Sequence, residues 1–150
     1  MAEKKGSILA VQLLGALCMM VLWWLSGSGL LDGEPQDTVW RFLGRFHPVV
    51  LHLPIGMLFM LLVLEFVSLR RPGSTASELI PLVLGMTIGS TLLAVATGTM
   101  LAYGEGADEQ LVQDHMRNGI WLAMGTVMLG VLRTLPSRGT YYLVLIATGV

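Results

Sequence analysis

HPVVLHLPIGMLFMLLVLEFVSL, residues 47–69, is an apolar run that contains one carboxylate, Glu65, and no lysine or arginine. A helix needs roughly 20 consecutive apolar residues to cross the hydrocarbon core of a bilayer. The run meets that length, and Arg70, Arg71 and Pro72 follow it directly. It therefore predicts a transmembrane helix.

Further apolar runs occupy 8–31, 79–103, 111–132 and 141–150. All but the last are long enough to span, and we expect the last helix to continue beyond Val150 in the natural protein. The chain is 54% hydrophobic and 13% charged, whereas soluble domains are about 25% charged. The predicted fold class is all-α: a polytopic membrane helix bundle of about five transmembrane helices.

The charges between the runs predict the orientation. One side carries the cations Lys4, Lys5, Arg70, Arg71, Arg133 and Arg138. The other side carries the acids Asp32, Glu34, Asp37, Glu105, Asp108 and Glu109. Cytoplasmic loops are enriched in lysine and arginine, so the N-terminus is expected in the cytoplasm. The predicted location is the bacterial inner membrane, crossed several times.

We divide the chain into three parts: an N-terminal transmembrane helix and tail at 1–33, an outer amphipathic segment at 34–46, and a four-helix membrane domain at 47–150. The first run is too long for a signal peptide and lacks an A-x-A site, so we expect it to be retained. The outer segment mixes Trp40, Phe42, Leu43 and Phe46 with Arg41 and Arg45, as in a helix lying on the membrane surface.

The three histidines, His47, His52 and His115, all fall on the predicted outer side of the membrane. His47 and His52 are five positions apart, which on a helix is a rotation of roughly 140°, so they do not share a face. His52 and His115 have similar expected depths on different helices, as two axial ligands require. We predict bis-histidine ligation of a haem b by His52 and His115, with His47 assisting or replacing one of them; copper is the alternative.

Other side chains near the same end fit this hypothesis. Arg41, Arg45 and Arg117 are candidates to hold haem propionates. Met57, Met100 and Met116 are possible soft ligands or wall residues. The competing interpretation is that the histidines form hydrogen bonds at the water boundary, with Asp114 beside His115 as one partner.

Glu65 is the acid within an apolar run, near the cytoplasmic end of its helix. Intramembrane carboxylates are costly and often functional. We expect it to pair with Arg70 or Arg133, and a place on a proton path is the alternative. The spacing of four between Gly85 and Gly89, and between Ala94 and Gly98, indicates close helix packing.

Several classes of function have no support. Cys18 is the single cysteine, which excludes an internal disulfide or a thiolate cluster. The net charge of -1 gives no sign of nucleic-acid binding. The sequence contains no phosphate loop, nucleophile triad or paired catalytic carboxylates, so no catalytic residues are predicted.

The stretch RFHPVVLHLPIG, residues 45–56, resembles the signature of a bacterial membrane family catalogued as domain of unknown function 2231. Members of the family typically show F-H-P, then three further residues, then H-x-P-I. A long helix follows, with an acidic residue near its end, and Glu65 matches that residue. A later helix begins with a histidine and, soon after, a glycine; His115 and Gly119 match these. The resemblance covers about residues 40–150 and implies a four-helix membrane domain. Some relatives continue into an outer iron–sulfur or c-type cytochrome domain, which implies a redox setting.

We therefore predict an electron-transfer subunit that passes electrons between a periplasmic cytochrome and a quinone or partner complex, in contact with lipid and other membrane subunits. The alternative is a structural or assembly subunit of a larger membrane complex, without a cofactor of its own. A transporter is less well supported, because no inverted repeat or pair of broken helices is visible.

Overall fold

The computed structural model describes residues 2–27, 38–102, 109–136 and 138–149, and in these ranges it contains helices and no strands. The helices are α1 (Ala2–Gly27), α2 (Thr38–Gly44), α3 (His47–Arg70), α4 (Thr75–Ala102), α5 (Glu109–Arg133) and α6 (Gly139–Gly149). The predicted all-α helix bundle is confirmed. Each of the five apolar runs is a helix, and α2 lies within the predicted amphipathic segment.

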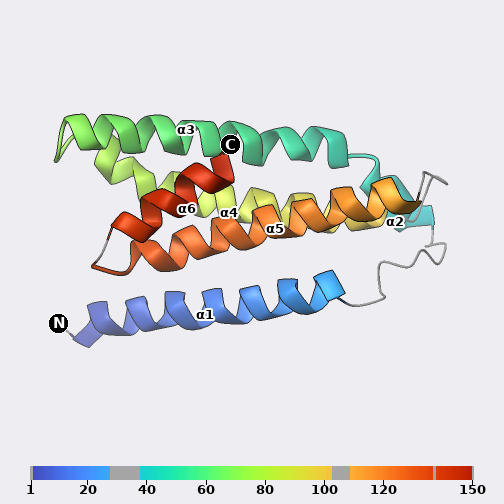
Figure 1. Cartoon of the computed structure of the whole chain (residues 1–150), viewed down its shortest axis with the longest axis horizontal. Helices are drawn as coiled ribbons and strands as arrows, with labels where there is room; N and C mark the ends of the chain where they lie inside the picture. Colours follow the sequence, from blue (N-terminus) through green and yellow to red (C-terminus); the bar gives the residue numbers. More distant parts are fainter. Residues whose placement is uncertain (1, 28–37, 103–108, 137, 150) are drawn as a thin grey trace.

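The four long helices, α1, α3, α4 and α5, run side by side along the length of the bundle (Figure 1). α4 packs against α2, α3 and α5, and α5 also packs against α1 and α6. α2 lies at the end of the bundle where α3 begins, and α1 begins at the opposite end. The short α6 lies beside α5 and contacts α3.

Three stretches of the described residues are long and apolar enough to cross a membrane, namely Gly6–Ser26, Thr38–Arg70 and Thr75–Leu101. Large apolar side chains on these helices point outward, including Leu14 and Phe59, as lipid-facing residues do. The sequence predicted about five spans. α5 has the length but begins with a polar stretch, and the 11 residues of α6 extend only about 16 Å.

The buried core consists of two groups of apolar side chains. One joins α3, α4, α5 and α6 through Leu61, Ile80, Leu84, Leu129, Leu132, Tyr141 and Leu145. The other joins α1 and α5 through Leu22, Ile120, Ala123, Met124 and Val127. Buried threonine hydroxyls between them donate to carbonyls one turn back, as Thr91 does to the Thr87 carbonyl at 2.6 Å, so burial leaves these hydroxyls satisfied.

Two glycines allow close contact with α4. A Cβ on Gly44 would lie 2.5 Å from the Leu101 backbone nitrogen, so only glycine lets α2 pack this closely. A Cβ on Gly98 would lie 3.0 Å from Cε1 of His47, so Gly98 makes room for that ring. The predicted packing role of the 94–98 spacing is thus confirmed at Gly98. Gly85 and Gly89 have open space around the Cβ position, so this pair makes no close contact among the described residues.

Candidate functional site

At the α2 end of the bundle, the rings of His47 on α3 and His115 on α5 face each other edge to plane. Their centroids are 6.2 Å apart and their planes are inclined at 82°. His47 is half-buried and His115 is exposed. Two imidazoles from separate helices therefore converge at one depth in the bundle.

The Thr97 hydroxyl lies beside the ring of His47. Thr97 Oγ1 is 3.0 Å from the carbonyl oxygen of Leu93 and 3.2 Å from that of Ala94, both within α4. The same oxygen lies 3.3 Å from Nδ1 of His47. When the hydroxyl donates to one of these carbonyls, it accepts the Nδ1 proton of His47, and Nε2 then carries the lone pair.

Nε2 of His47 is buried and has no hydrogen-bond partner among the described residues. A buried polar atom without a partner costs on the order of 1–3 kcal/mol, so native proteins rarely retain one without a reason. His47 also lines the cavity described next, so a ligand in that cavity is the candidate partner for Nε2.

A cavity of about 220 Å³ lies between α3, α4 and α5 and has both rings in its wall. Small residues line it, including Gly98 and Gly119, and a Cβ on Gly119 would meet open space. A second cavity of about 770 Å³, bounded by α3, α5 and the end of α6, shares the wall residues Asn118 and Leu122 with the first. The second cavity is open at the surface, because Phe59 and Trp121 in its wall are exposed, and it adjoins the cavity of the histidine pair.

His52 does not take part in this pair, which departs from the predicted pairing of His52 with His115. Its side chain is exposed, and Nδ1 lies 2.6 Å from the Pro48 carbonyl of its own helix. The roughly 140° between His47 and His52 explains the difference: α3 can turn only one of them toward α5, and it turns His47. Pro54 lies inside the continuous α3 and is buried in the cavity wall.

The other predicted site residues have varied surroundings, and Met57 lies near the middle of α3 rather than at its first turn. Arg41 and Arg45 are exposed on α2 and directly after it. Arg117 is exposed and pairs with Asp114 at 2.7 Å, so Asp114 bonds to this arginine rather than to a histidine.

Met116 is buried in the cavity wall, whereas Met57 and Met100 are not among the wall residues. Among the described residues, no group of three or more His, Cys, Asp or Glu side chains is close enough to hold a metal ion.

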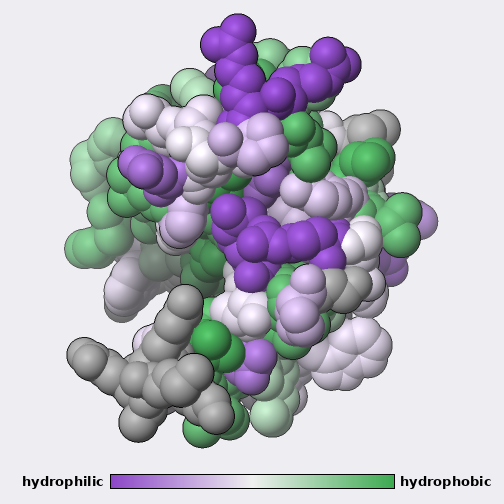
Figure 2. Space-filling model, turned by 90° about the vertical axis from the view of Figure 1, so that its left-hand side faces the viewer, coloured by the Kyte–Doolittle hydropathy of each residue, from purple (hydrophilic) through white to green (hydrophobic). Residues whose placement is uncertain are grey.

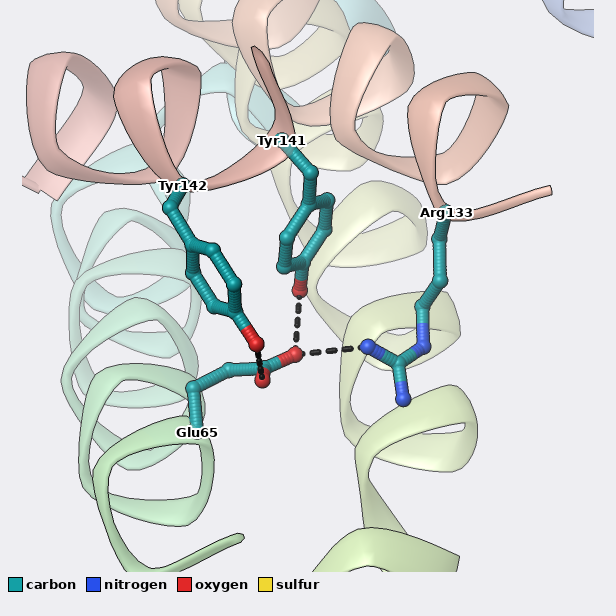
Figure 3. Close-up of polar contacts among 4 residues, drawn as sticks. All are labelled: Glu65, Arg133, Tyr141 and Tyr142. Atoms are coloured by element: carbon teal, nitrogen blue, oxygen red, sulfur yellow. Dashed lines mark hydrogen bonds and ion pairs between the residues drawn. The ribbon is translucent and has the colours of Figure 1, made fainter. Parts of the chain in front are cut away.

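At the opposite end of α3, Glu65 joins three helices through its carboxylate (Figure 3). Arg133 Nη1 on α5 donates to Oε1 at 2.6 Å. From α6, the Tyr141 hydroxyl donates to Oε1 at 2.7 Å and the Tyr142 hydroxyl to Oε2 at 3.3 Å. The predicted pairing with Arg133 is confirmed, while Arg70 lies over the Phe66 ring at 4.8 Å.

These four residues, Glu65, Arg133, Tyr141 and Tyr142, form a cluster that we call the Glu65 quartet. It lies at the end of the bundle where α3 and α5 end. Viewed from that end, one group of hydrophilic side chains lies near the centre and others project at the upper edge, with hydrophobic side chains at the sides (Figure 2). The Glu65 side chain is 4% exposed, so its charge is neutralised by Arg133 rather than by water. Glu65 and His47 are about 27 Å apart along α3, so the quartet is separate from the histidine site.

Three residues of these sites were missed in the sequence. Tyr141 and Tyr142 open the last apolar run directly after the basic loop, at the expected level of Glu65, so their position was a usable signal. Thr97 gave no signal, because a threonine in an apolar helix usually bonds only to its own backbone.

A scan of the chain against protein-family models gives no match, and searches of curated proteins and of solved structures give none either. The family resemblance of residues 45–56 therefore remains a prediction.

Proposed function

We propose that this chain is a membrane-embedded electron-transfer subunit that holds a redox cofactor, haem b in the first instance, between His47 and His115. The observation that carries the proposal is the buried Nε2 of His47, which has no hydrogen-bond partner among the described residues and belongs to a ring 6.2 Å from a second imidazole. Thr97 supports it, because metal-binding histidines almost always donate their other ring N–H to a neighbouring acceptor.

The two rings are close enough for both to bind one cofactor once a side chain rotates. Metal–imidazole bonds are about 2.0–2.1 Å, and the ring centroids of His47 and His115 are 6.2 Å apart. The edge-to-plane arrangement turns the face of one ring toward the other, so that ring would rotate about its side-chain bonds to present a nitrogen. Apolar residues such as Leu51 and Ile120 line the cavity, and the exposed His115 lies at its open side.

The size of the cavities bears on which cofactor is held. A bound haem or copper ion supplies one-electron redox chemistry. The cavity of about 220 Å³ is below the roughly 300–1,000 Å³ of typical small-molecule pockets, so a haem must extend into the adjoining cavity of about 770 Å³. Arg41, Arg45 and Arg117 are the cations for its propionates. Copper would need less room, and Met116 in the cavity wall would be the soft ligand available beside the two histidines.

The loop charges support the setting of this activity. With the basic ends of the helices in the cytoplasm, the chain crosses the bacterial inner membrane several times and turns the His47–His115 site toward the periplasm. The partners that fit are a periplasmic cytochrome on that side and other membrane subunits within the bilayer. Nucleic acid has no part in this proposal.

An absorption spectrum of the purified full chain, with metal analysis, tests the proposal. We expect a reduced-minus-oxidised α-band and iron for haem, or copper without that band. H47A and H115A each lose the cofactor, whereas the matched variant H52A keeps it. A preparation with neither iron nor copper, or equal loss in H52A, overturns the proposal.

The alternative, a structural or assembly subunit, is favoured by α1. Only 11% of its spanning window is buried within the chain, which leaves an apolar face for another membrane subunit. A variant with all three histidines replaced distinguishes the two functions in cells. Assembly of the complex with full respiratory activity supports the structural role, and assembly with lost activity supports electron transfer.

A further inference from the structure

α2 lies beyond the hydrocarbon core of the membrane. The 24 residues of α3 extend about 36 Å, which already exceeds a core of about 30 Å. Although Thr38–Arg70 reads as one apolar stretch, α2 therefore falls at the level of the lipid headgroups, at the end of the bundle where Figure 1 places it.

The surface of α2 and of the turn after it combines apolar and cationic side chains. The exposed fractions of its large apolar residues run from 39% to 66%, and these residues are Val39, Trp40, Phe42, Leu43 and Phe46. Arg41 and Arg45 are exposed among them. Aromatic residues of this kind concentrate at the boundary between acyl chains and headgroups, where their rings are shielded from water.

This surface is held firmly against the rest of the fold. The close approach of Gly44 to the backbone of α4 fixes one side of α2. The turn into α3 is closed by backbone hydrogen bonds from Arg45 N to Phe42 O and from Phe46 N to Leu43 O, at 3.2 and 3.1 Å. The Phe42 and Phe46 rings also meet edge to plane at 5.5 Å. The two arginines are thus presented at a fixed height directly before His47.

We propose that α2 and residues 45–46 form a binding surface for anionic phospholipid in the leaflet beside the His47–His115 site. Arg41 and Arg45 bind the lipid phosphates by charge-assisted hydrogen bonds, while Trp40 and the phenylalanines enter the upper acyl region. A cation near a membrane surface strengthens binding to anionic lipid roughly fivefold, so we expect roughly a 30-fold preference from the pair at low salt.

The test uses the full chain in nanodiscs of phosphatidylcholine and phosphatidylglycerol at 7:3. With Trp23, Trp24 and Trp121 changed to Phe, Trp40 reports alone. We expect brominated phosphatidylglycerol to quench Trp40 more strongly than the same fraction of brominated phosphatidylcholine. R41Q/R45Q removes that preference and keeps quenching by both lipids.

R70Q/R71Q, at the other end of α3, is the matched control and leaves the preference intact. If the triple tryptophan variant does not fold, a fluorophore on V39C in a C18S background gives the same readout. Equal quenching of Trp40 by the two brominated lipids overturns the proposal. The absence of quenching by either lipid also overturns it, and means that water or an acidic protein surface covers α2. Arg41 and Arg45 are also the proposed cations for the haem propionates, so R41Q/R45Q is assayed for lipid preference alone. The spectral test of the histidine site uses H47A, H115A and H52A, which leave both arginines in place.

Discussion

At the level of single residues, Nδ1 of His47 lies 3.3 Å from the Thr97 hydroxyl, which can accept the Nδ1 proton while it donates to a carbonyl of α4. T97V keeps the shape of the side chain but removes the acceptor, so Nδ1 of His47 loses this partner. We expect the affinity for the cofactor to fall about 10- to 100-fold. Titration of the cofactor-free protein with haem or copper measures this.

T97S is the control for that experiment, because it keeps the hydroxyl and should bind nearly as the parent chain does. Unchanged affinity in T97V would mean that Thr97 does not position His47. Folding is checked by helix content in both variants.

The sequence predicted the end of the bundle at which the histidines gather, but not which of the two on α3 faces inward. The charges of the loops indicate how deep each histidine lies in the membrane. The rotation of α3 about its own axis, which decides which histidine faces inward, depends on packing. Here the ring of His47 fits against Gly98, and that contact is set by the crossing of α3 and α4, which no local pattern encodes. Thr97 was missed for the same reason.

At the level of the elements, the Glu65 quartet fastens α3 to α5 and α6. E65A removes the carboxylate and leaves Arg133 in a largely buried position without its partner. Breaking one side of a buried pair costs about 3–5 kcal/mol, so we expect a loss of that order in the free energy of unfolding. Unfolding in mixed detergent micelles measures it.

E65Q separates charge from hydrogen bonding, because it keeps an acceptor for the tyrosines and should lose less. R70Q is the surface control: Arg70 is exposed and stacks on Phe66, and its replacement should change stability by about 0.5 kcal/mol or less. Wild-type stability in E65A would show that the quartet does not hold α6 in place.

The elements themselves were largely predictable, because long apolar runs between charged loops leave little choice but helix. The outer segment was also expected, and α2 lies within it. Three stretches of the described residues meet the length and hydropathy of a span. α5 is not one of them, because its first turns include Gln113, Asp114 and Arg117 near the histidine site.

At the level of the whole molecule, the two clusters of polar residues lie at the two ends of α3, and an apolar surface lies between them. The histidine site and α2 occupy one end, and the Glu65 quartet occupies the other, with exposed apolar side chains along the helices. Such a pattern suits a bilayer crossing with two distinct faces. The basic residues flanking the quartet, Arg70, Arg71 and Arg138, predict that this face lies in the cytoplasm.

Cysteine labelling in a C18S background tests this orientation with two matched threonine substitutions. T38C, at the start of α2, and T75C, at the start of α4, are both exposed and lie at opposite ends of the bundle. We expect a membrane-impermeant maleimide to label T38C in cells with a permeabilised outer membrane, and T75C only after the inner membrane is opened. The reverse pattern would turn the His47–His115 site to the cytoplasm. A periplasmic cytochrome could then not reach it, and the electron-transfer proposal would need a cytoplasmic or membrane partner.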